Sequence, residues 1–257
     1  MSYLLICTVA VLASGLTFFS GFGLGTLLMP VFALFFPVPL AVAMTAVVHF
    51  LNNLFKLVLV GKHADRASVL AFGAAAIPAA LAGAWLLSSL AGWDPLFTWT
   101  ALGRECAVTP VKIVVAVLLV FFAAFEVVPA LRDLSFDRRF LPVGGLLAGF
   151  LGGLTGHQGA LRSAFLIRAG LGKEALVATG VVLACVVDVV RLAVYGTTLA
   201  HAGLQAHAAL VGAATASAFA GAWAGNRLLK KVTLRAVQGS VAVMLIVIAL
   251  AMGTGLV

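Results

Sequence analysis

GFGLGTLLMP at residues 21–30 recurs in altered form as GHQGALRSAF at residues 156–165, which is 135 positions further along the chain. The offset holds downstream without a gap, so Asn53 corresponds to Asp188 and Lys56 to Arg191. Glycines interrupt a helix and free backbone amides, and hydrocarbon tolerates free amides only where they line a cavity inside the protein. A glycine-interrupted apolar segment at matching positions of two halves therefore indicates a membrane transporter whose binding site lies at the breaks.

The composition is that of a membrane protein. Of the 257 residues, 63% are hydrophobic and 9% are charged, and the mean hydropathy is +1.20. Soluble domains are about a quarter charged. Apolar stretches of about 20 residues recur along most of the chain, and each is long enough to cross roughly 30 Å of hydrocarbon. We therefore expect an all-α polytopic membrane protein that forms a single transmembrane domain over residues 1–257 and contacts the lipid bilayer.

The net charge of +8 indicates how the chain is oriented in the membrane. Cytoplasmic loops are rich in Lys and Arg, whereas nucleic-acid binding would call for basic runs with interleaved aromatics, and the chain has none. Basic residues gather after residue 60, in a linker at residues 131–141 and before the last apolar segment, so these three loops are predicted to be cytoplasmic. The loops at residues 92–109 and 196–203 hold at most one Lys or Arg and are predicted to face outward.

Two further features concern processing and cofactors. The three cysteines, Cys7, Cys106 and Cys185, show no CxxC or metal-ligand spacing, so neither a metal nor a cofactor is expected. The apolar N-terminal segment has no Lys or Arg before Lys56, which argues against a cleaved signal peptide because such a peptide needs a basic start.

The second break predicts a re-entrant helix pair. Residues 142–154 and 160–169 begin and end near basic residues assigned to the cytoplasm, and each is too short to span alone at 1.5 Å per residue. By the repeat, residues 2–36 should do the same from outside, although residues 2–19 are nearly long enough to span alone. Three spanning helices follow each pair, so the second half should be upside down relative to the first. We therefore expect two inverted repeats, each a re-entrant pair plus three transmembrane helices, at about residues 1–130 and 142–257.

Both breaks are candidate anion sites. A half-helix is expected to begin after each break, at Thr26 and at Ala160, and its free N–H groups and positive dipole end favour an anion. Glycines also permit close helix packing, which would explain the pattern without a ligand. The candidate binding residues of the breaks themselves are Gly21, Gly23, Gly25, Thr26, Gly156 and Gly159.

Polar side chains add to the second break, namely His157, Gln158, Arg162 and Ser163. Arg162 falls in the first turn of its half-helix, where an uncompensated guanidinium is costly, so a partner or a ligand is expected. It could clamp an oxyanion or donate to carbonyls of the broken helix. His157 could relay protons, donate to the substrate, or be a neutral histidine bonded to the backbone.

The helices that follow the breaks each carry a polar face, because their polar residues lie three or four positions apart. These faces hold His49, Asn52, Asn53 and Lys56 in the first half and Asp188, Arg191 and Tyr195 in the second. Asp188 and Arg191 could neutralise each other, and Lys56 could reach the lipid head groups. Together with Arg162, the deep cations outnumber the clear deep acid, Asp188, which suits an anionic substrate.

One further acid, Glu126, stands near the cytoplasmic end of its helix, just before a proline. At that position the nearby linker offers Arg132 as a counter-ion, so we expect Glu126 to pair with Arg132 rather than to contact the substrate.

The motifs resemble those of the sulfite exporter TauE/SafE family (the TSUP transporters), which has two repeated halves with a glycine-rich, proline-terminated motif in each. The stretches that carry the resemblance are GFGLGTLLMP, then PLAVAMTAVVHFLNNLFKLVLVGKHAD, then GLLAGFLGGLTGHQGALRSAFL, so it covers essentially the whole chain. The resemblance implies a transporter, often an exporter, of sulfite, sulfonates or related small anions in a prokaryotic plasma membrane. The matching positions are Gly21, Gly23, Gly25 and Pro30, then Gly156, Gly159, Arg162 and Ser163. The sequence departs from the family pattern at four positions, and these differences bear on which substrate the protein carries. They are Leu24, His157, Gln158 and Phe165.

We therefore expect a secondary transporter, an exporter of a small sulfur-containing anion, that works by alternating access and has no catalytic residues. A channel-like anion conduit, an intramembrane enzyme and a non-transporting assembly subunit are the alternatives. Against the enzyme, the chain has no doubled acid, HExxH or nucleophile–base motif. Proton or ion coupling and a homodimer are left open by the sequence.

Overall fold

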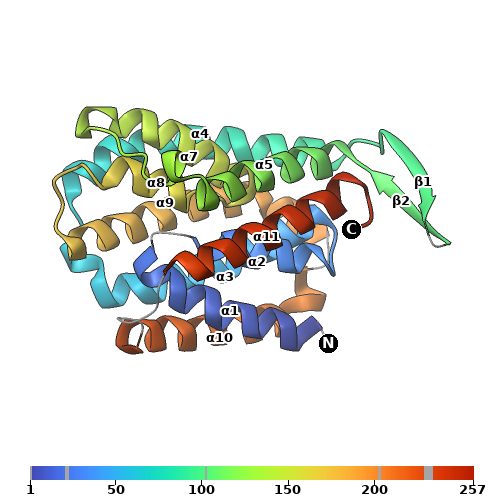
Figure 1. The fold of residues 1–257 in the computed structure, drawn as a ribbon, viewed down its shortest axis with the longest axis horizontal. Coiled ribbons are helices and arrows are strands. Elements are labelled where there is room, and N and C mark those ends of the chain that lie inside the picture. The colour runs from blue at the N-terminus through green and yellow to red at the C-terminus, as the bar shows by residue number, and fades with distance from the viewer. Residues whose placement is uncertain (1, 21–22, 102, 202–203, 229–233) are drawn as a thin grey trace.

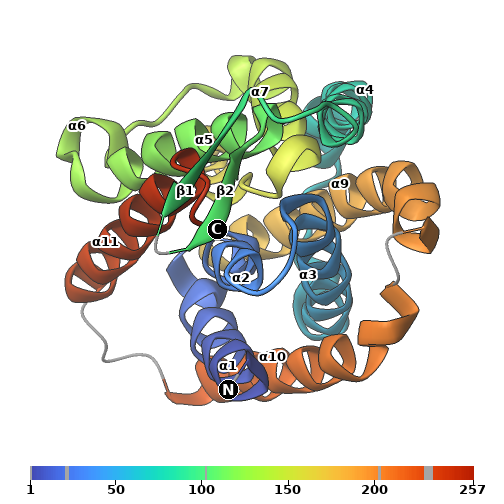
Figure 2. The same cartoon turned by 90° about the vertical axis from the view of Figure 1, so that its right-hand side faces the viewer.

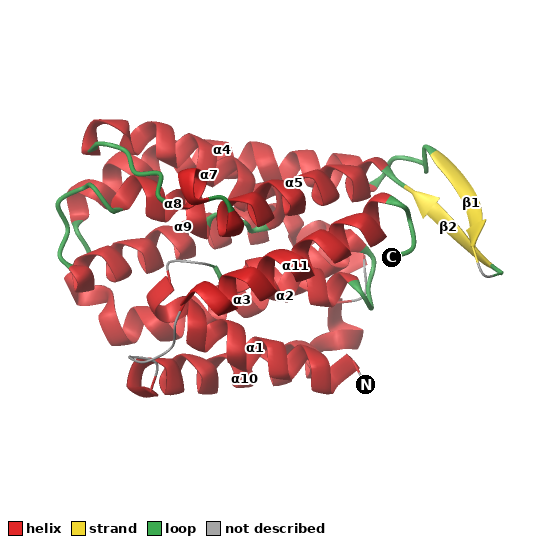
Figure 3. Ribbon diagram, viewed as in Figure 1, coloured by secondary structure: helices red, strands yellow, loops and turns green. Residues whose placement is uncertain are grey.

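The computed structural model describes residues 2–20, 23–101, 103–201, 204–228 and 234–257, which form a bundle of helices with a β hairpin at one end (Figures 1 and 3). The elements of the first half are α1 (Ser2–Ser20), α2 (Leu24–Ala33), α3 (Val38–Val60), η1 (Gly61–His63), α4 (Arg66–Ala91), β1 (Phe97–Ala101), β2 (Arg104–Val108) and α5 (Pro110–Val127). A linker with α6 (Pro129–Arg132) and η2 (Arg138–Phe140) follows. The elements of the second half are α7 (Leu141–Thr155), α8 (Gly159–Leu166), α9 (Lys173–His201), η3 (Leu204–His207), α10 (Ala208–Leu228) and α11 (Leu234–Gly253).

Within the described residues, five helical segments are long and apolar enough to cross a membrane. This confirms the prediction of an all-α polytopic membrane protein. The five segments are Val38–His63, Arg66–Ala91, Pro110–Val127, Lys173–Gly196 and Ala208–Gly225.

The bundle has two ends that differ in chemistry. Both chain termini and the β hairpin lie at one end, here called the hairpin end (Figure 1). At the other, the linker end, Arg138 of the linker lies 3.3 Å from Asp65 after η1, and His63 lies 3.5 Å from Glu174 at the start of α9. Asp65 also caps α4 by accepting a hydrogen bond of 2.8 Å from the amide of Ser68, and the side chain and the amide of Ser68 together lower the pKa of its carboxyl group. The basic loops predicted to be cytoplasmic at residues 61–66 and 131–141 therefore meet at one end.

Each of the short helix pairs returns to the end from which it starts. The pair α1–α2 begins at the hairpin end, and Ala33 at its finish lines the same cavity as Thr109 and Val257. The pair α7–α8 belongs to the linker end, because the amide of Phe136 donates to the carbonyl of Ala164 at 3.1 Å.

Helix boundaries follow the 135-residue offset read from the sequence. The helices α1 and α7 end at Ser20 and Thr155, and α2 and α8 begin at Leu24 and Gly159. Packing follows the same pattern, because α1 lies against α10 and α7 against α4, while α3 packs on α9 and α5 on α11 (Figure 2). Exchanging the two halves turns the α1–α10 contact into the α7–α4 contact and leaves the α3–α9 and α5–α11 contacts unchanged.

The hairpin lies where the sequence analysis reads only a polar break, at residues 92–109. The strands β1 and β2 pair antiparallel, from Phe97 opposite Val108 to Ala101 opposite Arg104. Aromatic and β-branched residues favour this conformation, and Gly103, with a φ of 75°, contributes to the turn. The indole Nε1 of Trp99 donates to the carbonyl of Thr254 at 2.7 Å, so the hairpin is tied to the C-terminal end of the bundle.

Close helix contacts depend on a glycine stripe on α7. Gly145, Gly149 and Gly153 face α4, and a Cβ atom at Gly153 would collide with the backbone carbonyl of Ala80. Small residues at such positions let transmembrane backbones approach closely. Close helix packing therefore explains these three glycines.

We expect Gly153→Ala to destabilise the protein by about 3 kcal/mol, because the added methyl meets backbone that cannot move aside. Gly212→Ala in α10 is the matched control, since a Cβ atom there would have no neighbour within 4 Å. The control should be neutral or more stable by at most about 1 kcal/mol. Thermal unfolding of the detergent-solubilised variants measures both effects, and equal melting temperatures would show that the α4–α7 contact is not tight.

Candidate functional site

The two breaks touch each other inside the bundle. Gly23 is extended (φ −83°, ψ 139°) and precedes α2, while Gly156 is left-handed (φ 84°, ψ 0°) and ends α7. A Cβ atom at Gly25 would lie 3.3 Å from the carbonyl oxygen of Gly156. The half-helices begin at Leu24 and Gly159, slightly before the predicted Thr26 and Ala160, and Gly21 lies outside the described residues.

Neither half-helix has a side chain that caps its N-terminus. Gly23 cannot provide one, and the side chain of Gln158, which precedes α8, makes no capping hydrogen bond. Thr26, in the first turn of α2, is buried. The first amides of both helices thus retain the partial positive charge that helix N-termini carry.

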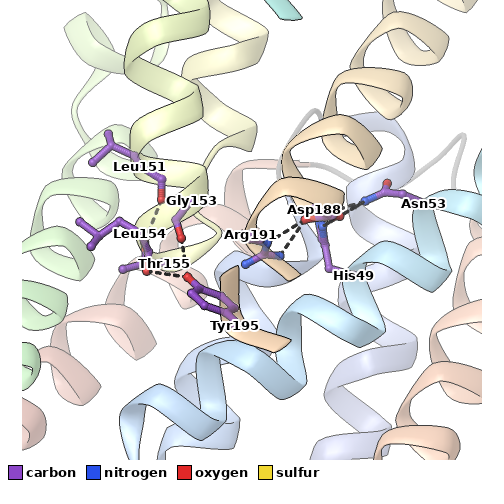
Figure 4. Close-up of polar contacts among 9 residues, drawn as sticks. All are labelled: His49, Asn53, Leu151, Gly153, Leu154, Thr155, Asp188, Arg191 and Tyr195. Atoms are coloured by element: carbon purple, nitrogen blue, oxygen red, sulfur yellow. Dashed lines mark hydrogen bonds and ion pairs between the residues drawn. The ribbon is translucent and has the colours of Figure 1, made fainter. Parts of the chain in front are cut away.

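A buried ion cluster joins the two halves beside the breaks (Figure 4). Nδ1 of His49 lies 2.6 Å from Oδ2 of Asp188, and the side-chain nitrogen Nδ2 of Asn53 lies 3.5 Å from the same oxygen. Nε and Nη2 of Arg191 lie 2.9 and 2.8 Å from Oδ1. Asp188 and Arg191 are both fully buried and pair with each other. Mutual neutralisation of these two residues was the alternative to ligand binding.

The guanidinium of Arg191 also explains the glycine at position 156. A Cβ atom at Gly156 would lie 2.5 Å from Nη1 of Arg191, so any side chain there would displace the guanidinium. The left-handed backbone disfavours other residues independently. The glycine at position 156 therefore allows the guanidinium of Arg191 to approach the backbone at the break.

Several buried polar atoms around the second break have no hydrogen-bond partner among the described residues. They include Nε2 of His157, both amide atoms of Gln158, and Nη1 of Arg162 and of Arg191. Buried polar atoms in proteins are almost always paired. A cluster of unpaired ones at a single place indicates where a polar ligand or water completes the structure.

The remaining predicted residues surround this cluster. Lys56 is buried at 5% exposure, so it does not extend to the head groups as the alternative supposes. Arg162 is buried on α8, and its side chain lies against α9, where a Cβ atom at Gly180 would be 3.4 Å from its Nε. Ser163 is half-buried on α8 and Gly159 is buried at its start.

Two further contacts support the second break. The hydroxyl of Tyr195 donates to the carbonyls of Gly153 and Leu154 at the end of α7, so it holds the break in place. The sequence placed Tyr195 on the polar face with Asp188 and Arg191, but its bond to the break was not predicted. The hydroxyl of Thr155, which was not named as a site residue, lies 3.0 Å from Nδ1 of His157.

Two more supporting contacts had no local signal. The hydroxyl of Ser14 donates to Asn52 at 3.0 Å and ties α1 to α3. The ring of Phe122 stacks on His157, with centroids 5.1 Å apart and an interplanar angle of 19°. Both contacts join segments far apart in the sequence, so no spacing rule predicts them.

These features define an all-helical, multi-pass membrane protein in which two interrupted helices meet at a buried, charged centre. The model of the family described as Sulfite exporter TauE/SafE matches residues 6–252, and the chain therefore belongs to the sulfite exporter TauE/SafE family, as its motifs suggest. Comparisons with curated proteins and with solved structures found no match. Membership places the chain among membrane exporters of sulfite and related anions.

Proposed function

We propose that this protein exports a small sulfur-containing oxyanion, sulfite or a sulfonate, by alternating access. The observation that carries the proposal is the set of unpaired donors at the contact of the two breaks, led by Nη1 of Arg162. The family match supports the substrate class, because its description is that of sulfite exporters.

The charges of the site favour an anion. Lys56, Arg162 and Arg191 supply three basic groups against the single carboxylate of Asp188, all of them buried. Asp188 already accepts from Arg191 and His49, which leaves the Arg162 fork as the group best suited to clamp an oxyanion. The uncapped half-helix ends beside it add further donors for the same charge.

The arrangement of the two halves supports a carrier. The pairs α1–α2 and α7–α8 come from opposite ends of the bundle and meet at the site, as expected of inverted repeats that exchange roles between inward and outward states. Burial of the site residues requires a conformational change before a ligand can enter, which an open channel would not need. The linker end, with Arg138 and Arg139, faces the cytoplasm of a prokaryotic cell in this proposal.

Uptake of radiolabelled sulfite into proteoliposomes tests the proposal. We expect uptake that saturates with concentration and that is accelerated by unlabelled sulfite on the other side, because a carrier exchanges substrate across the membrane. A sulfonate should compete, whereas acetate and sodium should not. Uptake that rises linearly with concentration would favour a conduit, and no uptake above that of empty liposomes would refute transport.

Binding can be measured separately on the detergent-solubilised protein. A ligand at 100 times its Kd stabilises the folded state by about 2.7 kcal/mol, which appears as a higher melting temperature. A melting temperature unaffected by sulfite, sulfate and sulfonates alike would contradict the anion site.

A further inference from the structure

Glu126 is a buried acid that the proposed site does not use. It lies in α5, a segment long enough to span the membrane, and its side chain is 4% exposed. Oε2 has no hydrogen-bond partner among the described residues. Ionisable residues inside membrane segments are costly and are usually functional, so this carboxyl needs a physical explanation.

Its position links it to the anion site. Phe122, one turn before Glu126 on α5, stacks on the ring of His157 at the second break. Residues four apart lie on one helix face, so Glu126 shares a face of α5 with Phe122. Glu126 lies one helical turn closer to the linker end than Phe122 does.

The charged groups near Glu126 are few. The helices packed against α5 carry only Arg66 at the start of α4, Arg132 in α6 and Arg235 in α11, while α5 itself has Lys112 at its far end. The side chain of Arg132, the counter-ion expected from the sequence, lies outside the described part of the chain, as does that of Arg235.

We infer that Glu126 binds one proton for each anion transported, so that the protein moves the two together. This inference rests on the proposed function. A buried carboxylate is unfavourable as a charged group, and an oxyanion arriving nearby makes the charged form more so. Anion binding therefore favours the protonated carboxyl, and by linkage the proton favours anion binding to the same degree.

The proton balance is simple. The carboxylate takes a proton from water at the side where the anion enters and returns it to water at the side where the anion leaves. No bond other than the O–H bond forms or breaks. The net charge that crosses the membrane with each anion is thus less negative by one unit than the charge of the anion alone.

Glu126→Gln tests the inference, because the amide mimics the neutral carboxyl but cannot release a proton. Proteoliposomes containing the dye pyranine report the internal pH while radiolabelled sulfite enters. Sulfite itself binds protons equally in every variant, so the difference in protons per sulfite isolates Glu126. We expect the wild type to bring in one more proton per sulfite than E126Q. The exposed Glu174, changed to Gln, is the matched control and should behave as the wild type.

The outcomes separate the two proposals. Equal proton counts per sulfite in the wild type and E126Q would overturn the role of Glu126 while leaving transport intact. Absence of sulfite transport in the wild type would overturn the proposed function itself. If E126Q does not fold, which would itself argue against a neutral carboxyl at this site, Glu126→Asp provides the second measurement, and it should keep the wild-type proton count at a lower rate.

Discussion

Replacing Arg162 by alanine is expected to abolish anion transport while leaving the protein folded and inserted. The guanidinium is buried and its Nη1 makes no hydrogen bond to a described residue. Truncating the side chain therefore breaks no hydrogen bond of the protein at Nη1. Two charge-assisted hydrogen bonds to an oxyanion would contribute about 3 kcal/mol, which corresponds to a loss of roughly 100-fold or more in affinity. The decrease should appear both in sulfite uptake and in the sulfite-dependent melting temperature.

Two companion variants define what Arg162 contributes. Arg162→Lys keeps the charge but loses the planar fork, so we expect intermediate affinity, lowered by about tenfold. Arg168→Ala removes an exposed arginine two residues beyond α8 and should leave transport unchanged. Wild-type uptake and binding in R162A would show that the clamp lies elsewhere.

Replacing Asp188 by alanine is expected to be the most destabilising change in the site. The carboxylate neutralises Arg191 and accepts from His49, and all three side chains are buried. Removing one partner of a buried pair leaves an uncompensated charge and costs about 3 to 5 kcal/mol. For a chain of this size, the melting temperature should fall by roughly 10 °C or more.

The double variant D188A/R191A distinguishes a structural pair from an essential carboxylate. Because it removes both charges, it should be more stable than D188A alone, although it should not transport. Melting curves of the single and double variants provide the coupling between the two residues. A double variant no more stable than D188A would mean that Arg191 is compensated by another group.

The glycine breaks could be predicted because their chemistry is local. Glycines also occur within regular membrane helices such as α7, so it was the recurrence of the pattern of Gly21, Gly23 and Gly25 at Gly156 that made the prediction specific. Contacts between the breaks could not be predicted in detail. The pairing of Asp188 with Arg191 is an i,i+3 contact and was foreseen, whereas its partner His49 lies 139 residues away.

Two features were outside what periodicity can show. Glu126 stands next to a helix end, where solvent exposure is the usual expectation, yet its side chain is buried. The β1 and β2 strands are five residues each in a segment with turn residues on both sides, so the polar composition concealed them.

The β1–β2 hairpin makes the two halves unequal. The matching connection, between α10 and α11, is residues 229–233, too short for two such strands. In a carrier built from identical halves, the states open to either side would be degenerate, because exchanging the halves converts one into the other. The bond from Trp99 to Thr254 adds a contact at the hairpin end that belongs to the first half's hairpin. We therefore expect the resting population to be biased toward one side of the membrane even without any ligand or gradient.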